Sequence, residues 1–312
     1  MNVERRRARA AAVLGRQPAS LGPVPGERPA PGVVTGEIRD VSPHLLVLEN
    51  ADGDEVRLVI APWATAWHGG DAAPADLPLG ARAIVRTAGE YGRVADRIWV
   101  DITRFTGKIL RVHGTRDLTV ELDCGPHRGR RTITIPYRAT GRIQVRYPRL
   151  EPGYLFDAIG TLGKGNPTAL FPAASQPPYR ADAVPAPPLT YAVPSVQVGS
   201  AVWSDAFDED ERGAAYPRLE RSDAECDQAG VTCAALPYLA LGSAVRVENQ
   251  CTGRSAVVPI VACGCLTGRF CDRCVECGTS ERGRIVELSP ASFVELGGEL
   301  SKGCFNAGIG LG

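Results

Sequence analysis

An internal repeat in the first half of the chain constrains its fold most strongly. The segment TGEIRDVSPHLLVLEN begins at Thr35, and TGKILRVHGTRDLTVELD begins at Thr106. Each copy continues into a strand-like segment with a Pro-aromatic pair, RLVIAPWAT in the first and TITIPYRAT in the second. Apolar and polar residues alternate along these segments, as in strands with one buried face. NADGDE and DCGPHRGR are typical turn sequences. The repeat therefore predicts two similar all-β units in tandem.

Each copy contains five expected short strands, which favours a small closed barrel because closure leaves no exposed edge. The pattern is similar to that of OB-fold barrels, and we expect one barrel over residues 31–103 and a second over 104–171. Some OB-folds bind oligonucleotides or sugars. No strand face here shows the aromatic and basic ladder that single-strand binding uses. We interpret this half as a scaffold or docking module.

The flanking segments differ in composition from the repeat. Residues 1–30 contain ERRRARA and predict a basic arm or short helix, since AAAVLG is too short for the apolar part of a signal peptide. The stretch 172–196 is rich in proline and predicts a semi-rigid linker. Lys and Arg total 35, as do Asp and Glu, which argues against nucleic acid as a partner. No apolar run is long enough to insert into a membrane.

After the linker, further strand-like segments follow, including VQVGSAVWS, GSAVRVENQ, GRSAVVPIVA and RGRIVELS. SPASFVELGG then predicts a short helix. Ser289 is its N-cap and Pro290 its first residue. The pair Gly297-Gly298 ends it.

Two of these segments carry a family resemblance. LPYLALGSAVRVENQCTGRSAVVPIV, followed by GRIVELSPASFVELGGELSKG, resembles the double-psi β-barrel of the rare lipoprotein A, expansin and barwin group. The likeness covers Val198 to Gly312 and none of residues 1–190. It implies a third barrel over 197–312. The expected fold is all-β, with tandem five-stranded OB-like barrels followed by a double-psi barrel with one short helix.

The resemblance implies action on cell-wall polysaccharide, by cleavage, loosening or binding. Cleavage of a glycosidic bond needs an acid and usually a second carboxylate. The histidine and the aspartate of the lytic members fall on Cys233 and Ala262, so we expect little or no catalysis. Glu287 matches an acid of expansins. With Asp205, it forms the remaining candidate catalytic pair.

Two aromatic residues of the same region are candidates for stacking on sugar rings. They are Trp203 and Tyr238. Aromatic faces provide rigid apolar contact surface with a polar handle, which suits such ligands.

Nine of the ten cysteines lie in the last third of the chain, which implies a local disulfide framework or a structural metal site. The Cys271-x-x-Cys274-x-x-Cys277 spacing could ligate zinc, within a cluster from Cys263 to Cys277. We expect no other cofactor. The resemblance favours disulfides, and connectivity stays open. The cysteines concerned are Cys226, Cys233, Cys251, Cys263, Cys265, Cys271, Cys274, Cys277 and Cys304.

These features support two main hypotheses of function. The first is a cell-wall glycan-binding or glycan-remodelling protein. The second is a structural component of an extracellular particle, such as a phage tail or filament, with homo-oligomerisation possible. Both place the protein outside the cell or at the wall by a non-classical route. If the cysteines bind metal, a cytoplasmic zinc-bearing adaptor is the third hypothesis.

Overall fold

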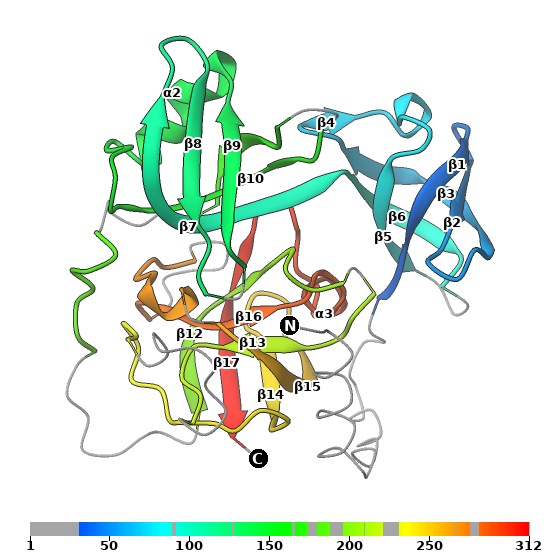
Figure 1. Ribbon diagram of the computed structural model, residues 1–312. Helices are drawn as coiled ribbons and strands as arrows, with labels where there is room; N and C mark the ends of the chain where they lie inside the picture. Colours follow the sequence, from blue (N-terminus) through cyan, green and yellow to red (C-terminus); the bar gives the residue numbers. More distant parts are fainter. Residues whose placement is uncertain are drawn as a thin grey trace.

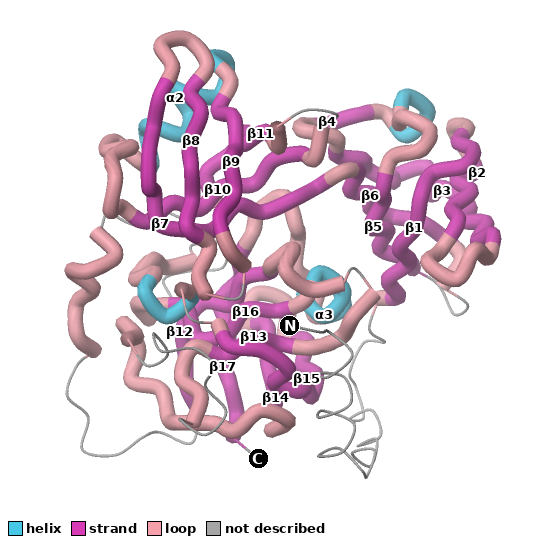
Figure 2. Tube along the Cα trace, viewed as in Figure 1, coloured by secondary structure: helices cyan, strands magenta, loops and turns pink. Residues whose placement is uncertain are grey.

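The computed structural model shows strands grouped in three consecutive barrels (Figures 1 and 2). The predicted arm, most of the predicted linker, and Cys226, Cys265 and Cys277 lie outside the described residues. The structure describes residues 31–88, 92–126, 128–163, 166–173, 180–187, 196–208, 210–220, 231–264, 266–274 and 281–311.

The first barrel joins its strands in the order β2-β1-β5-β6-β3-β4, and β2 also pairs with β3. Strand β3 is antiparallel to β2 and parallel to β6. The elements are β1 (Gly32–Val41), β2 (Leu45–Glu49), β3 (Glu55–Trp67), β4 (Asp71–Ala72), the 3-10 helix η1 (Pro74–Asp76), β5 (Arg82–Ala88) and β6 (Val94–Val100).

The second barrel is closed in the order β10-β11-β9-β8-β7 and carries one helix. Its apolar side chains form a core of their own beneath that helix. The elements are β7 (Ile102–His113), β8 (Leu118–Asp123), β9 (Arg130–Ile135), α2 (Tyr137–Arg146), β10 (Leu155–Thr161) and β11 (Thr168–Pro172).

The third barrel is closed by six strands in the order β12-β16-β13-β15-β14-β17. Two of its pairings, β12 with β16 and β13 with β15, are parallel, which requires crossing connections rather than hairpins. The elements are β12 (Val196–Trp203), β13 (Ala214–Tyr216), β14 (Ala244–Asn249), β15 (Arg254–Cys263), the 3-10 helix η2 (Thr267–Arg269), β16 (Arg284–Leu288), α3 (Pro290–Glu295) and β17 (Cys304–Leu311).

The predicted fold class is confirmed: the chain is all-β and built from tandem closed barrels. The predicted short helix is α3, and the hydroxyl of Ser289 caps it by accepting from the backbone N–H of Ser292 at 3.2 Å.

The two repeat copies diverge at their Pro-aromatic pairs. In the first copy, β3 runs past Pro62 to Trp67. In the second copy, the prediction that the strand extends through Tyr137 is wrong, because β9 ends at Ile135 and α2 begins at Tyr137. Pro136 precedes this helix with the extended backbone of an N-cap.

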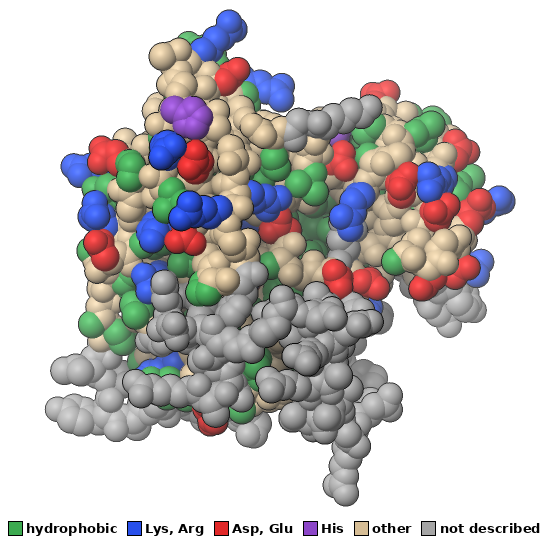
Figure 3. Space-filling view, in the orientation of Figure 1, with side chains coloured by type: hydrophobic (Ala, Val, Ile, Leu, Met, Phe, Trp, Pro, Cys, Tyr) green, Lys and Arg blue, Asp and Glu red, His purple; other side chains and the backbone are tan. Residues whose placement is uncertain are grey.

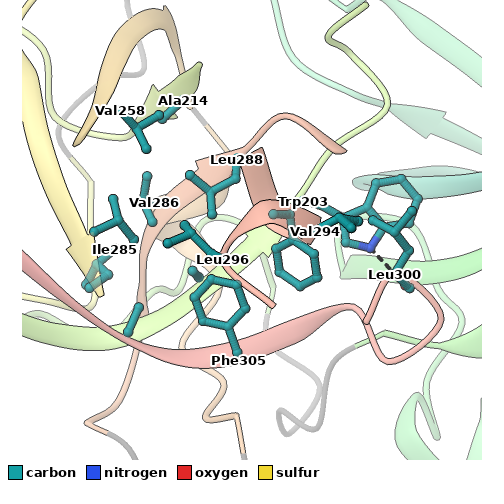
Figure 4. Packing of buried hydrophobic residues seen from close by; sticks show 14 of the residues in the cluster. Trp203, Ala214, Val258, Ile285, Val286, Leu288, Val294, Leu296, Leu300 and Phe305 are labelled. Atoms are coloured by element: carbon teal, nitrogen blue, oxygen red, sulfur yellow. Dashed lines mark hydrogen bonds between the residues drawn. The ribbon is translucent and has the colours of Figure 1, made fainter. Parts of the chain in front are cut away.

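The barrels pack against one another rather than standing apart. In Figure 1 the second barrel lies above the third, and the turn between β8 and β9 reaches down to it. One apolar cluster contains Trp99 of the first barrel, Ile159 of the second, and Trp203, Leu300 and Phe305 of the third. Figure 4 shows its part around Trp203 and Leu300. The interior therefore continues from barrel to barrel.

Candidate functional site: the charged interface of the second and third barrels

The predicted acid Glu287 lies on β16 with its carboxylate buried at the interface with the second barrel. The exposed fraction of the residue is 3%. Arg128, from the turn between β8 and β9, places Nη1 2.6 Å from Oε1. The hydroxyl of Thr267 donates to Oε2. Burial opposes ionisation, but the charge of Arg128 and hydrogen bonds from Ser204, Thr267 and Arg128 outweigh it and lower the pKa of Glu287 below its ordinary value.

The second predicted acid, Asp205, follows β12 and faces the same barrel. Arg131 on β9 places Nη1 2.6 Å from Oδ2, and the hydroxyl of Thr103 on β7 donates to that oxygen at 2.5 Å. Asp205 and Glu287 both act on Arg128 and raise its pKa against the opposing effect of burial. The two candidate carboxylates thus lie in one group of charges, here called the interface cluster: Arg128, Arg131, Asp205 and Glu287.

The interface cluster does not provide the environment of a glycosidase acid. A general acid needs a raised pKa so that it carries a proton at neutral pH. Glu287 is instead held ionised by a guanidinium, in a position closed by the second barrel. Each predicted carboxylate has a basic partner 2.6 Å away, so the arrangement neutralises charge and joins two barrels.

A second charged group, which sequence reasoning missed, lies wholly buried in the same interface. It consists of Arg104, Asp157, Asp272 and Arg284 and is here called the core network. Asp157 Oδ2 lies 2.6 Å from Nη2 of Arg104 and 2.5 Å from Nη2 of Arg284. Arg284 also lies 2.9 Å, through Nε, from Oδ1 of Asp272. The available signals were the lone charge inside the apolar strand LFDAIGT, Asp157, and the arginine that begins the apolar strand RIVEL, Arg284.

The core network keeps Asp157 strongly ionised. Burial of Asp157 opposes its charge, but the two arginines outweigh burial and lower its pKa to about 2. Arg104 also donates through Nη1 to the carbonyl of Gly303 at 2.5 Å. The ring of Phe270 lies 4.0 Å from the guanidinium of Arg284. Residues of three widely separated segments therefore meet around one carboxylate.

The two predicted sugar-stacking residues have opposite environments. Trp203 is only 1% exposed, and its Nε1 donates to the carbonyl of Leu300 at 2.9 Å. A buried ring presents no face to a sugar, so Trp203 is corrected to a core residue (Figure 4). Tyr238 is 53% exposed, and the guanidinium of Arg218 lies 4.2 Å from its ring centroid.

The two positions that the resemblance links to lytic catalysis are structural here. Ala262 lies on β15 opposite Ala215 of β13. Cys233 forms a disulfide with Cys271, their Cα atoms 5.4 Å apart. Neither position carries a group that could serve as the missing acid or base.

Three of the described cysteines are disulfide-bonded. Besides Cys233 and Cys271, Cys251 is disulfide-bonded. The sulfur of Cys271 is consequently not available to the predicted zinc cluster from Cys263 to Cys277. Among the described residues no group of three or more His, Cys, Asp or Glu side chains could hold a metal ion. Nor does this part of the chain contain a helix that is long and apolar enough to span a membrane.

Comparison with known proteins does not assign the chain to a family. No protein-family description matches the sequence, and no curated protein matches it.

Proposed function

We propose that the chain is a non-catalytic structural protein of an extracellular assembly, in which the third barrel serves as a stapled attachment module. The observation that carries this proposal is the interface cluster. Both candidate carboxylates are ion-paired to arginines of the second barrel, Glu287 to Arg128 and Asp205 to Arg131. Carboxylates neutralised in this way, with Glu287 buried and Asp205 part-exposed, hold barrels together and are not placed to protonate a substrate.

Three further observations support a structural building block. The first barrel is tied to the third, because Glu299 Oε1 accepts from Nε1 of Trp99 at 2.8 Å and lies 2.8 Å from Nη2 of Arg97. Acidic and basic side chains are interspersed on the face of the first two barrels shown in Figure 3, without a patch of one sign. The disulfide between Cys233 and Cys271 suits an oxidising compartment.

The absence of catalysis is tested directly on cell-wall glycan. The full chain is incubated with purified peptidoglycan, and soluble fragments are measured by liquid chromatography and mass spectrometry. We expect no release above buffer from the wild type or from Glu287→Gln. Release by the wild type that is lost in Glu287→Gln would overturn the non-catalytic assignment.

The assembly role is tested by light scattering behind size-exclusion chromatography over a wide concentration range. We expect the disulfide-intact chain to form a defined oligomer whose population rises with concentration. A chain that stays strictly monomeric at every concentration contradicts the structural role.

Glycan binding without cleavage is a second candidate, favoured by the exposed ring of Tyr238 beside Arg218. Pull-downs on insoluble peptidoglycan and cellulose compare the wild type with Tyr238→Ala. Tyr137→Ala is the matched control, because Tyr137 is also exposed and lies near Arg116, but on the second barrel. Retention lost only in Tyr238→Ala supports this candidate, and a folded wild type that is retained on neither material refutes it.

A further inference from the structure

Cys274 and Cys304 lie sulfur to sulfur beside the core network. Cys304 is the first residue of β17, and Cys274 is buried in the cysteine-rich segment after η2. Their Sγ atoms are 2.7 Å apart. Separated by thirty residues in sequence, they are brought together by the closure of the third barrel.

The flanking residues of both cysteines belong to or contact the core network. Asp272, two residues before Cys274, holds Arg284 at 2.9 Å. Gly303, immediately before Cys304, accepts from Arg104 through its carbonyl. A bond between the two sulfurs would therefore fix the positions of two backbone segments that present partners to the buried arginines.

The environment of Cys304 suits a structural pair rather than a reactive thiol. The hydrogen bond with Cys274, burial, and the nearby charges of Cys274 and Asp272 raise the pKa of Cys304 well above its ordinary value, against the opposing effect of Arg104. Catalytic and redox-sensing cysteines instead have lowered pKa values and accessible sulfurs.

We propose that Cys274 and Cys304 form a disulfide that braces the buried charge network between the second and third barrels. It forms by exchange with a disulfide donor, either a thiol–disulfide oxidoreductase or a small disulfide. One S–S bond forms between Cys274 and Cys304, and the S–S bond of the donor breaks. The two protein thiols lose two electrons and two protons in total, and the donor leaves as two thiols.

The pairing is tested by mapping on the full chain. The protein is equilibrated with reduced and oxidised glutathione, denatured in acid, alkylated and digested with trypsin. Trypsin cleaves after Arg273, Arg282 and Lys302, so the peptide that begins at Cys274 also carries Cys277. The Cys277→Ser variant removes this ambiguity.

We expect a cross-linked peptide that joins Cys274 to Cys304 in the wild type and in Cys277→Ser. Alkylation of both cysteines, or a cross-link from either of them to another cysteine, overturns the proposal. Because mapping needs no substitution at the pair itself, failure of a variant to fold cannot obscure the result.

The bracing role has its own readout. We expect the Cys274→Ser, Cys304→Ser double variant to lower the melting temperature by about 5–15 °C, as loss of a native disulfide does. Cys124→Ser is the control, because Cys124 lies at the same interface and has no disulfide partner among the described residues. Equal shifts in the two variants would contradict the bracing role.

Discussion

At the residue scale, the ion-pair partners of two carboxylates determine how the protein is interpreted. Glu287 and Asp205 are acidic residues of the kind that a glycan-cleaving barrel uses, and the family resemblance leaves them as the remaining candidate pair in a barrel from which little or no catalysis is expected. Their partners Arg128 and Arg131 come from the second barrel, which no pattern in the third barrel could reveal. A carboxylate's chemistry is set by its surroundings more than by its position in a motif.

Asp157 gives the interface a defined dependence on pH. Its ordinary pKa is 3.8, but between Arg104 and Arg284 it falls to about 2 in the folded protein. Between about pH 2 and pH 4, the unfolded chain therefore binds more protons at Asp157 than the folded protein does. The stabilisation by Asp157 is complete above about pH 4, amounts to roughly 2 kcal/mol, and is lost as the pH falls toward about 2.

The measurement is urea denaturation at a series of acidic pH values for the wild type and Asp157→Asn. We expect the variant to be destabilised by about 3–5 kcal/mol at neutral pH, because the arginines lose the charge that compensates them. We also expect it to lose part of the wild-type pH dependence. Asp205→Asn is the control, since its part-exposed ion pair contributes about 1 kcal/mol or less. Equal losses in the two variants would disprove the special role of Asp157.

At the element scale, two glycines of the second barrel have opposite requirements. Gly160 lies on β10 beside a register shift against β11, and an added Cβ would collide with the backbone carbonyl of Thr168. Gly141 lies on the exposed face of α2, where an added Cβ meets nothing within 4 Å. Glycine is therefore required at the first position and is only a source of backbone freedom at the second.

We expect Gly160→Ala to destabilise the barrel by at least about 2 kcal/mol, because the strand pair must separate to admit the methyl group. Gly141→Ala should instead stabilise the protein by about 0.5–1 kcal/mol, since alanine favours the helix. Thermal and chemical unfolding of the two variants measure both effects. A tolerated Gly160→Ala would contradict the close approach of β10 to β11.

The elements also show which sequence signals were sufficient. Alternation and turn residues predicted the strands, and the cap Ser289 predicted α3. Helix α2 was missed because analogy with the first copy extended the strand through Pro136. The spacing of Ala139, Ile143 and Tyr147 at every fourth residue was the available signal, and all three are buried. The disulfide partner of Cys233 could not be predicted, because spacing does not fix connectivity.

At the scale of the whole molecule, the sequence predicts three separate domains, but the three barrels contact one another. Arg97 and Trp99 of the first barrel meet Glu299 of the third, some 200 residues away. No local sequence pattern distinguishes these three residues from others of the same strand or turn. Local patterns report which face of a strand is buried, but not which other barrel buries it. That is why the interfaces had to be seen in the structure.

The shared contacts imply cooperative unfolding, which calorimetry measures. We expect the wild type to unfold in one transition, because a single apolar cluster includes residues of all three barrels. Glu299→Ala leaves the buried N–H of Trp99 unpaired and should destabilise the protein by about 1–3 kcal/mol. It should also separate an early transition of the first barrel.

Glu295→Ala is the matched control for this substitution. The side chains of Glu295 and Glu299 are similarly exposed, at 22% and 23%, but Glu295 pairs with Arg212 of its own barrel. We expect Glu295→Ala to keep one transition and to lose about 1 kcal/mol or less. If the wild type unfolds in several resolved steps, or if Glu295→Ala and Glu299→Ala behave alike, the barrels are independent domains and the contact at Glu299 does not couple them.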